Sequence, residues 1–203
     1  RLTVGFGVVC VLLVASVLMG LMAMGRMGAD LKAVVADHFP RIVAADNLST
    51  QIDVIAIALR NMMLNADAAD RERQTQVIAQ SRQEVVRLFD TLDKTLTEPK
   101  DRALLQKVKE QRALYLAGQE ELLGFIRSDQ TDQSREYLAS KLQPVLASYK
   151  ASIGALVESE KNAIVTAGTD ARDTAVNARN TLIGLGVTAL LLAVALGWLI
   201  TRS

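Results

Sequence analysis

Arginine and hydroxyl side chains lie close together at several points in the middle of the sequence. Ser81 is followed directly by Arg82, and Arg112 precedes Tyr115 by about one helical turn. A guanidinium group binds a carboxylate through two parallel hydrogen bonds, and a Ser or Tyr hydroxyl can hold the second oxygen or a ligand hydroxyl. These residue types predict a binding site for a small organic anion, either a dicarboxylate or an amino acid.

The candidate binding residues lie on or beside the apolar stripes of the expected helices. They are Arg60, Ser81, Arg82, Arg112, Tyr115, Tyr137 and Tyr149. A structural interpretation competes with the binding one for each of them. Arginines beside a core pack their methylene groups on it and pair with surface carboxylates, and buried tyrosines commonly serve as core aromatics.

No set of residues in the sequence matches a catalytic site. The single histidine, His38, has only the neighbouring Asp37 as a possible partner, and we expect it to be a partly exposed helix residue. The sequence contains no glycine-rich phosphate loop, HExxH motif or CxxC motif. The one cysteine, Cys10, cannot form an internal disulfide or a thiolate metal site. We therefore expect no enzyme activity, no metal and no cofactor.

Two long apolar runs flank the candidate residues and predict two membrane spans. The runs are Leu2–Gly25 and Thr181–Thr201. A hydrocarbon core of roughly 30 Å needs about 20 apolar residues in a helix, and both runs reach that length. A cleaved signal peptide is the rival interpretation of the first run, but the run is longer than the apolar region of a typical signal peptide, which has about 7 to 15 residues. Residues 26–180 should form a water-exposed domain with both ends tied to one bilayer.

Charge excludes one class of partner and leaves the orientation open. The formal net charge of +1 comes from charges of alternating sign, so nucleic acid is not an expected partner. Arg1 and Arg202 lie outside the two predicted spans, and Arg26 and Arg179 lie between them. Because these arginines balance, the positive-inside rule does not decide which side of the membrane holds the domain.

The central domain has the sequence pattern of an all-α fold. Apolar residues recur at spacings of three and four, as in Ile52, Ala56 and Leu59, which is typical of an amphipathic helix. Pro40 and Pro144 interrupt two of the helices and predict a kink or short break at each. Short loops force neighbouring helices to be antiparallel, so we expect an up-down-up-down four-helix bundle. The expected helices cover residues 27–66, 70–96, 99–128 and 131–180.

The first helix of the bundle carries more apolar surface than one core needs. Beside its main stripe it has a second stripe through Val54, Ile55, Ile57 and Ala58. A helix that is apolar on two sides usually contacts a partner beyond its own bundle. We therefore expect a homodimer in which two chains pack through their first helices.

At the level of layout the whole chain resembles the sensor half of a bacterial methyl-accepting chemotaxis protein. The resemblance rests on residues 1–7 at the start of the first span, Pro40 near the start of the first bundle helix, residues 58–61 near its far end, and residues 197–203. The last stretch is similar to the entry into the linker that follows the second membrane helix in these receptors, which would make 202–203 the start of a cytoplasmic linker. The resemblance also supports Arg60 and adds Asn61 to the binding candidates.

The resemblance implies a sensor domain in the periplasm, an inner-membrane location, and both termini in the cytoplasm. Ligand binding would displace the last helix and signal through the second span to a chemotaxis kinase complex. The site can lie within one bundle or between two. The same module also feeds sensor histidine kinases and diguanylate cyclases, so these outputs are alternatives. A third alternative is a periplasmic protein-interaction module without a small-molecule site, which a closed apolar core with Arg60 and Arg112 in solvent would favour.

Overall fold

The computed structural model describes the backbone of residues 2–202. Side chains are described except at 1–6, 8, 9, 30, 196, 197 and 199–203. Arg1 and Ser203, at the ends of two stretches that carry the resemblance, lie outside the described residues, as does the side chain of Arg202. The described backbone contains helices and no strand, and the prediction of an all-α four-helix bundle is confirmed. The elements are α1 (Leu2–Ala33), η1 (Val34–His38), α2 (Phe39–Leu64), α3 (Ala68–Thr95), α4 (Pro99–Arg127), α5 (Thr131–Tyr137), η2 (Leu138–Leu142) and α6 (Gln143–Arg202).

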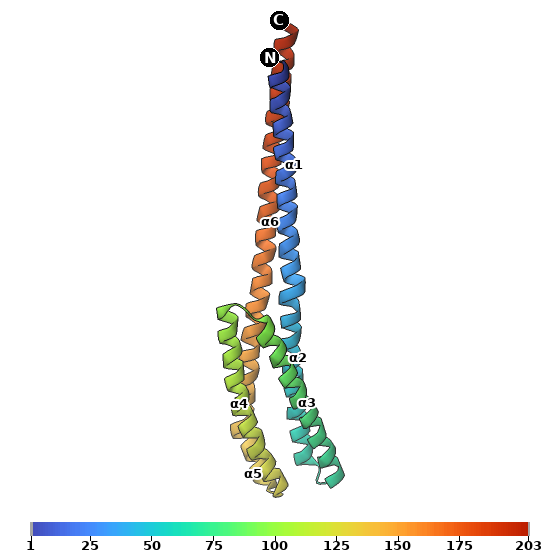
Figure 1. Cartoon of the computed structure of the whole chain (residues 1–203). Coiled ribbons are helices and arrows are strands. Elements are labelled where there is room, and N and C mark those ends of the chain that lie inside the picture. Colours follow the sequence, from blue (N-terminus) through green and yellow to red (C-terminus); the bar gives the residue numbers. More distant parts are fainter. Residues whose placement is uncertain (1, 203) are drawn as a thin grey trace. The chain divides into compact units, whose positions relative to one another are not determined.

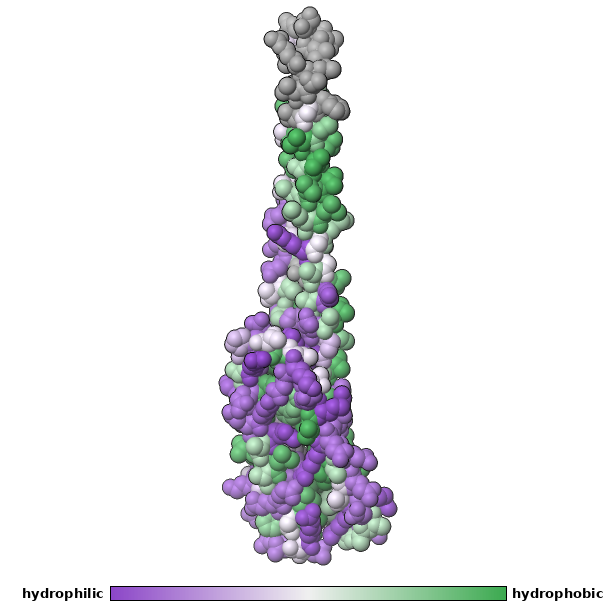
Figure 2. Space-filling model, in the orientation of Figure 1, coloured by the Kyte–Doolittle hydropathy of each residue, from purple (hydrophilic) through white to green (hydrophobic). Residues whose placement is uncertain are grey.

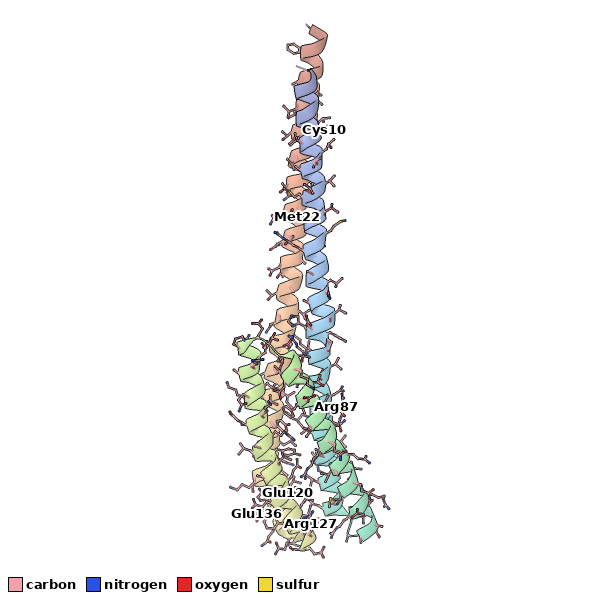
Figure 3. All side chains as sticks on the ribbon, in the orientation of Figure 1. Cys10, Met22, Arg87, Glu120, Arg127 and Glu136 are labelled. Atoms are coloured by element: carbon pink, nitrogen blue, oxygen red, sulfur yellow. The ribbon has the colours of Figure 1, made fainter. Side chains whose placement is uncertain are left out.

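The chain divides into two units, and the first has an apolar surface. It consists of Arg1–Ala36 and Ile164–Ser203. Two helices are long and apolar enough to cross a membrane by length and composition, one within Cys10–Leu64 and one within Thr131–Ala195. Figure 2 shows hydrophobic surface on part of this unit, and Met22, which Figure 3 labels, is 66% exposed. Such a surface suits a hydrocarbon solvent. The limits predicted for the two spans stay predictions.

The second unit, Asp37–Ala163, is the helical bundle and contains the core. Within it α2 lies beside α3 (Figure 1), and the rings of Tyr115 on α4 and Tyr149 on α6 lie side by side. The side chains of Leu48, Leu92, Val108 and Leu122 are 0% exposed, and each contributes about 1.5–3 kcal/mol by leaving water. Further fully buried apolar residues continue this core from one end of the bundle to the other: Ile52, Leu59, Leu96, Leu142 and Leu156.

Polar side chains and prolines mark the turns between the bundle helices. The Asp67 carboxylate accepts a hydrogen bond from the Asp70 backbone N–H at 2.8 Å, which caps the N-terminus of α3. Pro99 occupies the first position of α4, where its missing N–H costs no helical hydrogen bond. These local signals end and restart the helices at the positions that an antiparallel bundle requires.

Both internal prolines follow a π-helical turn. The turns are η1, two residues before Pro40, and η2, two residues before Pro144. A proline ring clashes with the carbonyl of the residue four positions earlier, which is Ala36 or Ser140, and each of these lies within a π-helical turn. The wider turn moves that carbonyl away from the ring. The helix predicted over 27–66 is therefore shared by α1, η1 and α2, and the helix predicted over 131–180 by α5, η2 and α6.

One glycine lets α4 and η2 approach closely. A Cβ atom at Gly118 would lie 2.7 Å from the Leu142 Cδ1 atom and 3.5 Å from the Tyr137 hydroxyl. Since Leu142 is 2% exposed, the absence of a side chain at Gly118 makes room for a core residue of the neighbouring segment.

Replacing Leu122 by Ala should lower the free energy of unfolding by about 2–5 kcal/mol, because it leaves a cavity in the core. The matched control is Leu114→Ala on the same helix, where the side chain is 55% exposed and the loss should stay below about 0.5 kcal/mol. Denaturant unfolding of the chain in lipid nanodiscs, followed by circular dichroism, measures both. Equal losses would contradict the placement of the core.

Candidate functional site

A small cavity lies among the four long helices of the bundle. About 20 Å³ is open to the centre of a water-sized sphere, which is room for about one water molecule. The lining residues come from α2, α3, α4 and α6, and they are Ile52, Ile55, Arg82, Val85, Arg112, Tyr115, Leu116, Gln119 and Tyr149. Its walls combine apolar side chains with two arginines and two tyrosines, which is the composition of a small-ligand pocket.

Two buried tyrosines bring unpartnered hydroxyl groups to the cavity. Tyr115 is 2% exposed and Tyr149 1% exposed, and their ring centroids are 5.8 Å apart. Neither hydroxyl has a hydrogen-bond partner among the residues that the structure describes. Buried polar groups are nearly always hydrogen-bonded, and leaving one unsatisfied costs about 1–3 kcal/mol. The two hydroxyls therefore offer hydrogen bonds that the folded chain does not use.

The same burial keeps both phenols protonated. Burial is the largest cause and raises the pKa of Tyr115 and that of Tyr149 well above the ordinary range. The Gln119 amide acts to lower the pKa of Tyr115, although the tyrosine hydroxyl makes no hydrogen bond of normal geometry. Arg112 acts to lower the pKa of Tyr149, so its charge is felt at that hydroxyl. At neutral pH both groups are hydrogen-bond donors.

Arg82 is held in place by neighbours on α4. Its Nε and one terminal nitrogen donate to the Gln119 Oε1 atom at 3.2 and 2.6 Å. The same terminal nitrogen lies 2.8 Å from a carboxylate oxygen of Glu120, an exposed residue that Figure 3 labels on α4. Much of the Arg82 charge is thus already compensated by the protein.

Arg112 has no such partner. Its guanidinium lies over the Phe89 ring, 5.1 Å from the ring centroid, and it forms no ion pair with any described residue. The ring faces the cation and holds it by a cation–π contact, which leaves the guanidinium edge free. The site therefore presents one uncompensated cation and two unused hydroxyl donors, and this arrangement can bind an anion with several acceptor oxygens.

Comparison with family models bears on the fold and on the role of the domain. A model described as a four-helix bundle sensory module for signal transduction matches residues 1–175. The chain belongs to this family. The resemblance to the sensor half of a chemotaxis receptor is confirmed by this match. The family is a sensory domain and not a catalytic one. A comparison with curated proteins found no match.

Within this sensory module, the structure brings four of the predicted binding residues to one cavity: Arg82, Arg112, Tyr115 and Tyr149. They share it because each lies on the inner side of its helix. Ser81 is buried on α3 but does not line the cavity.

The other three predicted residues lie elsewhere. Arg60 is exposed on α2, and Asn61 is half-buried, with its amide 3.5 Å from the Gln74 Oε1 atom. Tyr137 donates to the Glu121 carboxylate at 2.9 Å, outside the cavity. A site shared by all eight candidates is therefore not present within the bundle.

Sequence reasoning missed Gln119, which orients Arg82. The signal was present, because Gln119 follows Tyr115 by four residues and Arg112 by seven, so the three share one helical face. Gln119 is 1% exposed. A buried amide on the same face as an arginine and a tyrosine indicates a polar layer inside a bundle.

The raised pKa of the two buried tyrosines predicts how stability depends on pH. Above the ordinary tyrosine pKa of about 10, phenols of the unfolded chain lose their protons while Tyr115 and Tyr149 keep theirs. The unfolded state then binds fewer protons, so stability falls as pH rises, by up to about 1.4 kcal/mol per pH unit for each group.

A double variant, Tyr115→Phe with Tyr149→Phe, should lose less stability than the unmutated module between about pH 9 and pH 11. Unfolding by denaturant at several pH values measures this slope. Tyr137→Phe is the comparison: burial and the Glu121 carboxylate also raise the pKa of Tyr137, but its ring is only half-buried, so this variant should change the slope less than the double variant does. Identical slopes in the double variant and the unmutated chain would contradict burial of the phenols.

Proposed function

We propose that this sensory module is the periplasmic input of an inner-membrane chemoreceptor and binds a small organic anion in the bundle. The proposal rests above all on the two buried, unpartnered hydroxyls of Tyr115 and Tyr149 beside the uncompensated charge of Arg112. A carboxylate bound there would receive hydrogen bonds from all three. The ligand class is a dicarboxylate or an amino acid.

Binding requires the bundle to open. The cavity has room for about one water molecule, so even a small carboxylate must push the lining helices apart. Interiors are close-packed and respond to such strain by moving between discrete arrangements. A ligand that fits the open arrangement better than the closed one shifts the population toward it, by no more than its difference in affinity for the two.

The helix that would carry this change is α6. Tyr149 on α6 lines the cavity, and α6 continues to Arg202 beyond the second apolar run. A displacement of this helix relative to α4 would therefore reach the cytoplasmic side and bias a chemotaxis kinase complex. A coupling free energy of about 1–3 kcal/mol is typical for such systems.

A homodimer through α2 is part of the same proposal. The outer side of α2 exposes Val43 at 41%, Ile57 at 54% and Leu64 at 74%. These residues are separated by 14 and 7 positions and so form one stripe along the helix. Of the second stripe expected from the sequence, Ile55 and Ala58 are instead buried in the core, and Ile57 is exposed. A second copy packed on this stripe would remove it from water.

The ligand site is tested by calorimetric titration of the chain in nanodiscs with dicarboxylates and amino acids. Arg112→Ala should weaken binding of the best ligand about 10- to 100-fold, because it removes a charge-assisted hydrogen bond. Tyr149→Phe should weaken it about 2- to 10-fold. Arg73→Ala, which changes an exposed arginine paired with Asp70, is the control and should leave the affinity unchanged.

Arg60→Ala separates a site within one bundle from a site between two, because Arg60 is exposed on α2. A loss of affinity in Arg60→Ala but not in Arg112→Ala would place the site at the dimer interface. If no compound of the panel binds to the unmutated chain, the proposed ligand class is wrong.

The dimer is tested with two matched charge substitutions. Ile57→Glu on α2 should shift the chain toward monomer in sedimentation experiments in detergent, because a charge cannot be buried in an apolar interface. Leu114→Glu on α4 alters a side chain of similar exposure, 55% against 54%, and should leave the dimer intact. Equal behaviour of the two variants would exclude an interface on the α2 stripe.

A further inference from the structure

A second cluster of buried polar residues lies outside the cavity. The His38 Nδ1 atom is 2.6 Å from the Glu160 Oε2 atom, and a terminal nitrogen of Arg41 is 3.7 Å from the same oxygen. Glu160 is 1% exposed and Arg41 9% exposed. His38 ends η1, Arg41 lies in the first turn of α2, and Glu160 lies on α6, so the cluster joins α6 to the start of the bundle.

Part of this cluster is unused. The Glu160 Oε1 atom and the Arg41 Nε atom are buried, and neither has a hydrogen-bond partner among the described residues. Arginine can bind a carboxylate side-on through Nε and a terminal nitrogen together. A small shift would therefore move Glu160 from His38 to a bidentate pairing with Arg41, which would satisfy both orphaned atoms. One carboxylate thus has two available partners.

Protonation of the imidazole changes the strength of one of these two contacts. Histidine is the side chain that ordinarily changes charge between about pH 5 and pH 8. When His38 is protonated, its contact with Glu160 is an ion pair; when it is neutral, only a hydrogen bond remains.

The other charged groups near this layer have their own partners or lie in solvent. Asp37, on the same element as His38, is exposed. Asp101 at the start of α4 is 8% exposed and accepts a hydrogen bond from the Ser159 hydroxyl at 2.8 Å. The carboxylates near the end of α3 pair with lysines, Asp90 with Lys94 and Asp93 with Lys109.

We propose that His38, Arg41 and Glu160 form a proton-dependent latch, through which the module reads the acidity of its surroundings as a second input. At low pH, the Glu160 carboxylate pairs with His38, and at high pH it pairs with Arg41. His38 is the last residue of the π-helical turn η1, and such turns are frequent at functional sites. Glu160 lies eleven residues after Tyr149 on α6, so the latch and the cavity act on the same helix.

The latch is tested by the distance between two spin labels in the absence of ligand. The labels are attached to Asp46→Cys on α2 and Glu158→Cys on α6, both exposed positions, after Cys10 is changed to Ser. In nanodiscs, the ratio of two distance populations should change at least fivefold between about pH 5.5 and about pH 8. His38→Gln and Glu160→Gln should each abolish the change, and Asp101→Asn, a neighbouring buried carboxylate, should keep it.

Two results would overturn the latch: a distance distribution of the unmutated chain that ignores pH, or an unchanged pH response in His38→Gln. If the substituted chains do not fold, the unmutated chain still decides. It contains one histidine, so a chain labelled with isotopes at histidine gives a single imidazole signal. An imidazole that keeps one protonation state between about pH 5.5 and about pH 8 excludes the latch.

Discussion

Close packing around a short apolar layer is the constraint on which this bundle depends. Ile52 on α2, Val85 on α3, Tyr115 on α4 and Tyr149 on α6 meet at one level and leave space for about one water molecule. The aromatic rings fill the volume of the layer, but their hydroxyls have no hydrogen-bond partner among the described residues. Burial of the rings therefore stabilises the fold, and the unsatisfied oxygens reduce that gain at the level where a ligand would bind.

Each of the two polar sites contains a cation that the protein leaves incompletely paired. At the cavity, in the middle of the bundle, it is Arg112, which among the described residues is held by the Phe89 ring. At the start of α2 it is Arg41, 3.7 Å from a carboxylate already held by His38. Incomplete pairing makes an arrangement easier to change, because less interaction energy is lost when helices move. A sensor needs such incompletely paired groups in order to change conformation, whereas a purely structural bundle would pair them fully.

The helical pattern predicted the fold because spacings of three and four directly mark the buried face of a helix. It found Tyr115 and Tyr149 for the same reason. The helical pattern failed for Arg60, which follows the buried Leu59 and yet is exposed. Successive residues of an α-helix point about 100° apart, so neighbours in the sequence can lie on opposite sides of the boundary between core and solvent. The His38–Glu160 contact spans 122 positions and depends on the relative height of two helices, which no local pattern encodes.

The π-helical turn η2 is a place where the chain can gain or lose one residue. A turn closed by bonds five residues apart contains one residue more than a regular α-turn, so Leu138–Leu142 behaves as an α-helix with a single insertion. Because the wide turn absorbs the extra residue, deleting one residue there would restore regular α-helical geometry and keep the faces that α5 and α6 turn toward the bundle. Related chains that are one residue shorter at this point would thus keep both helices and the contact between Tyr137 and Glu121.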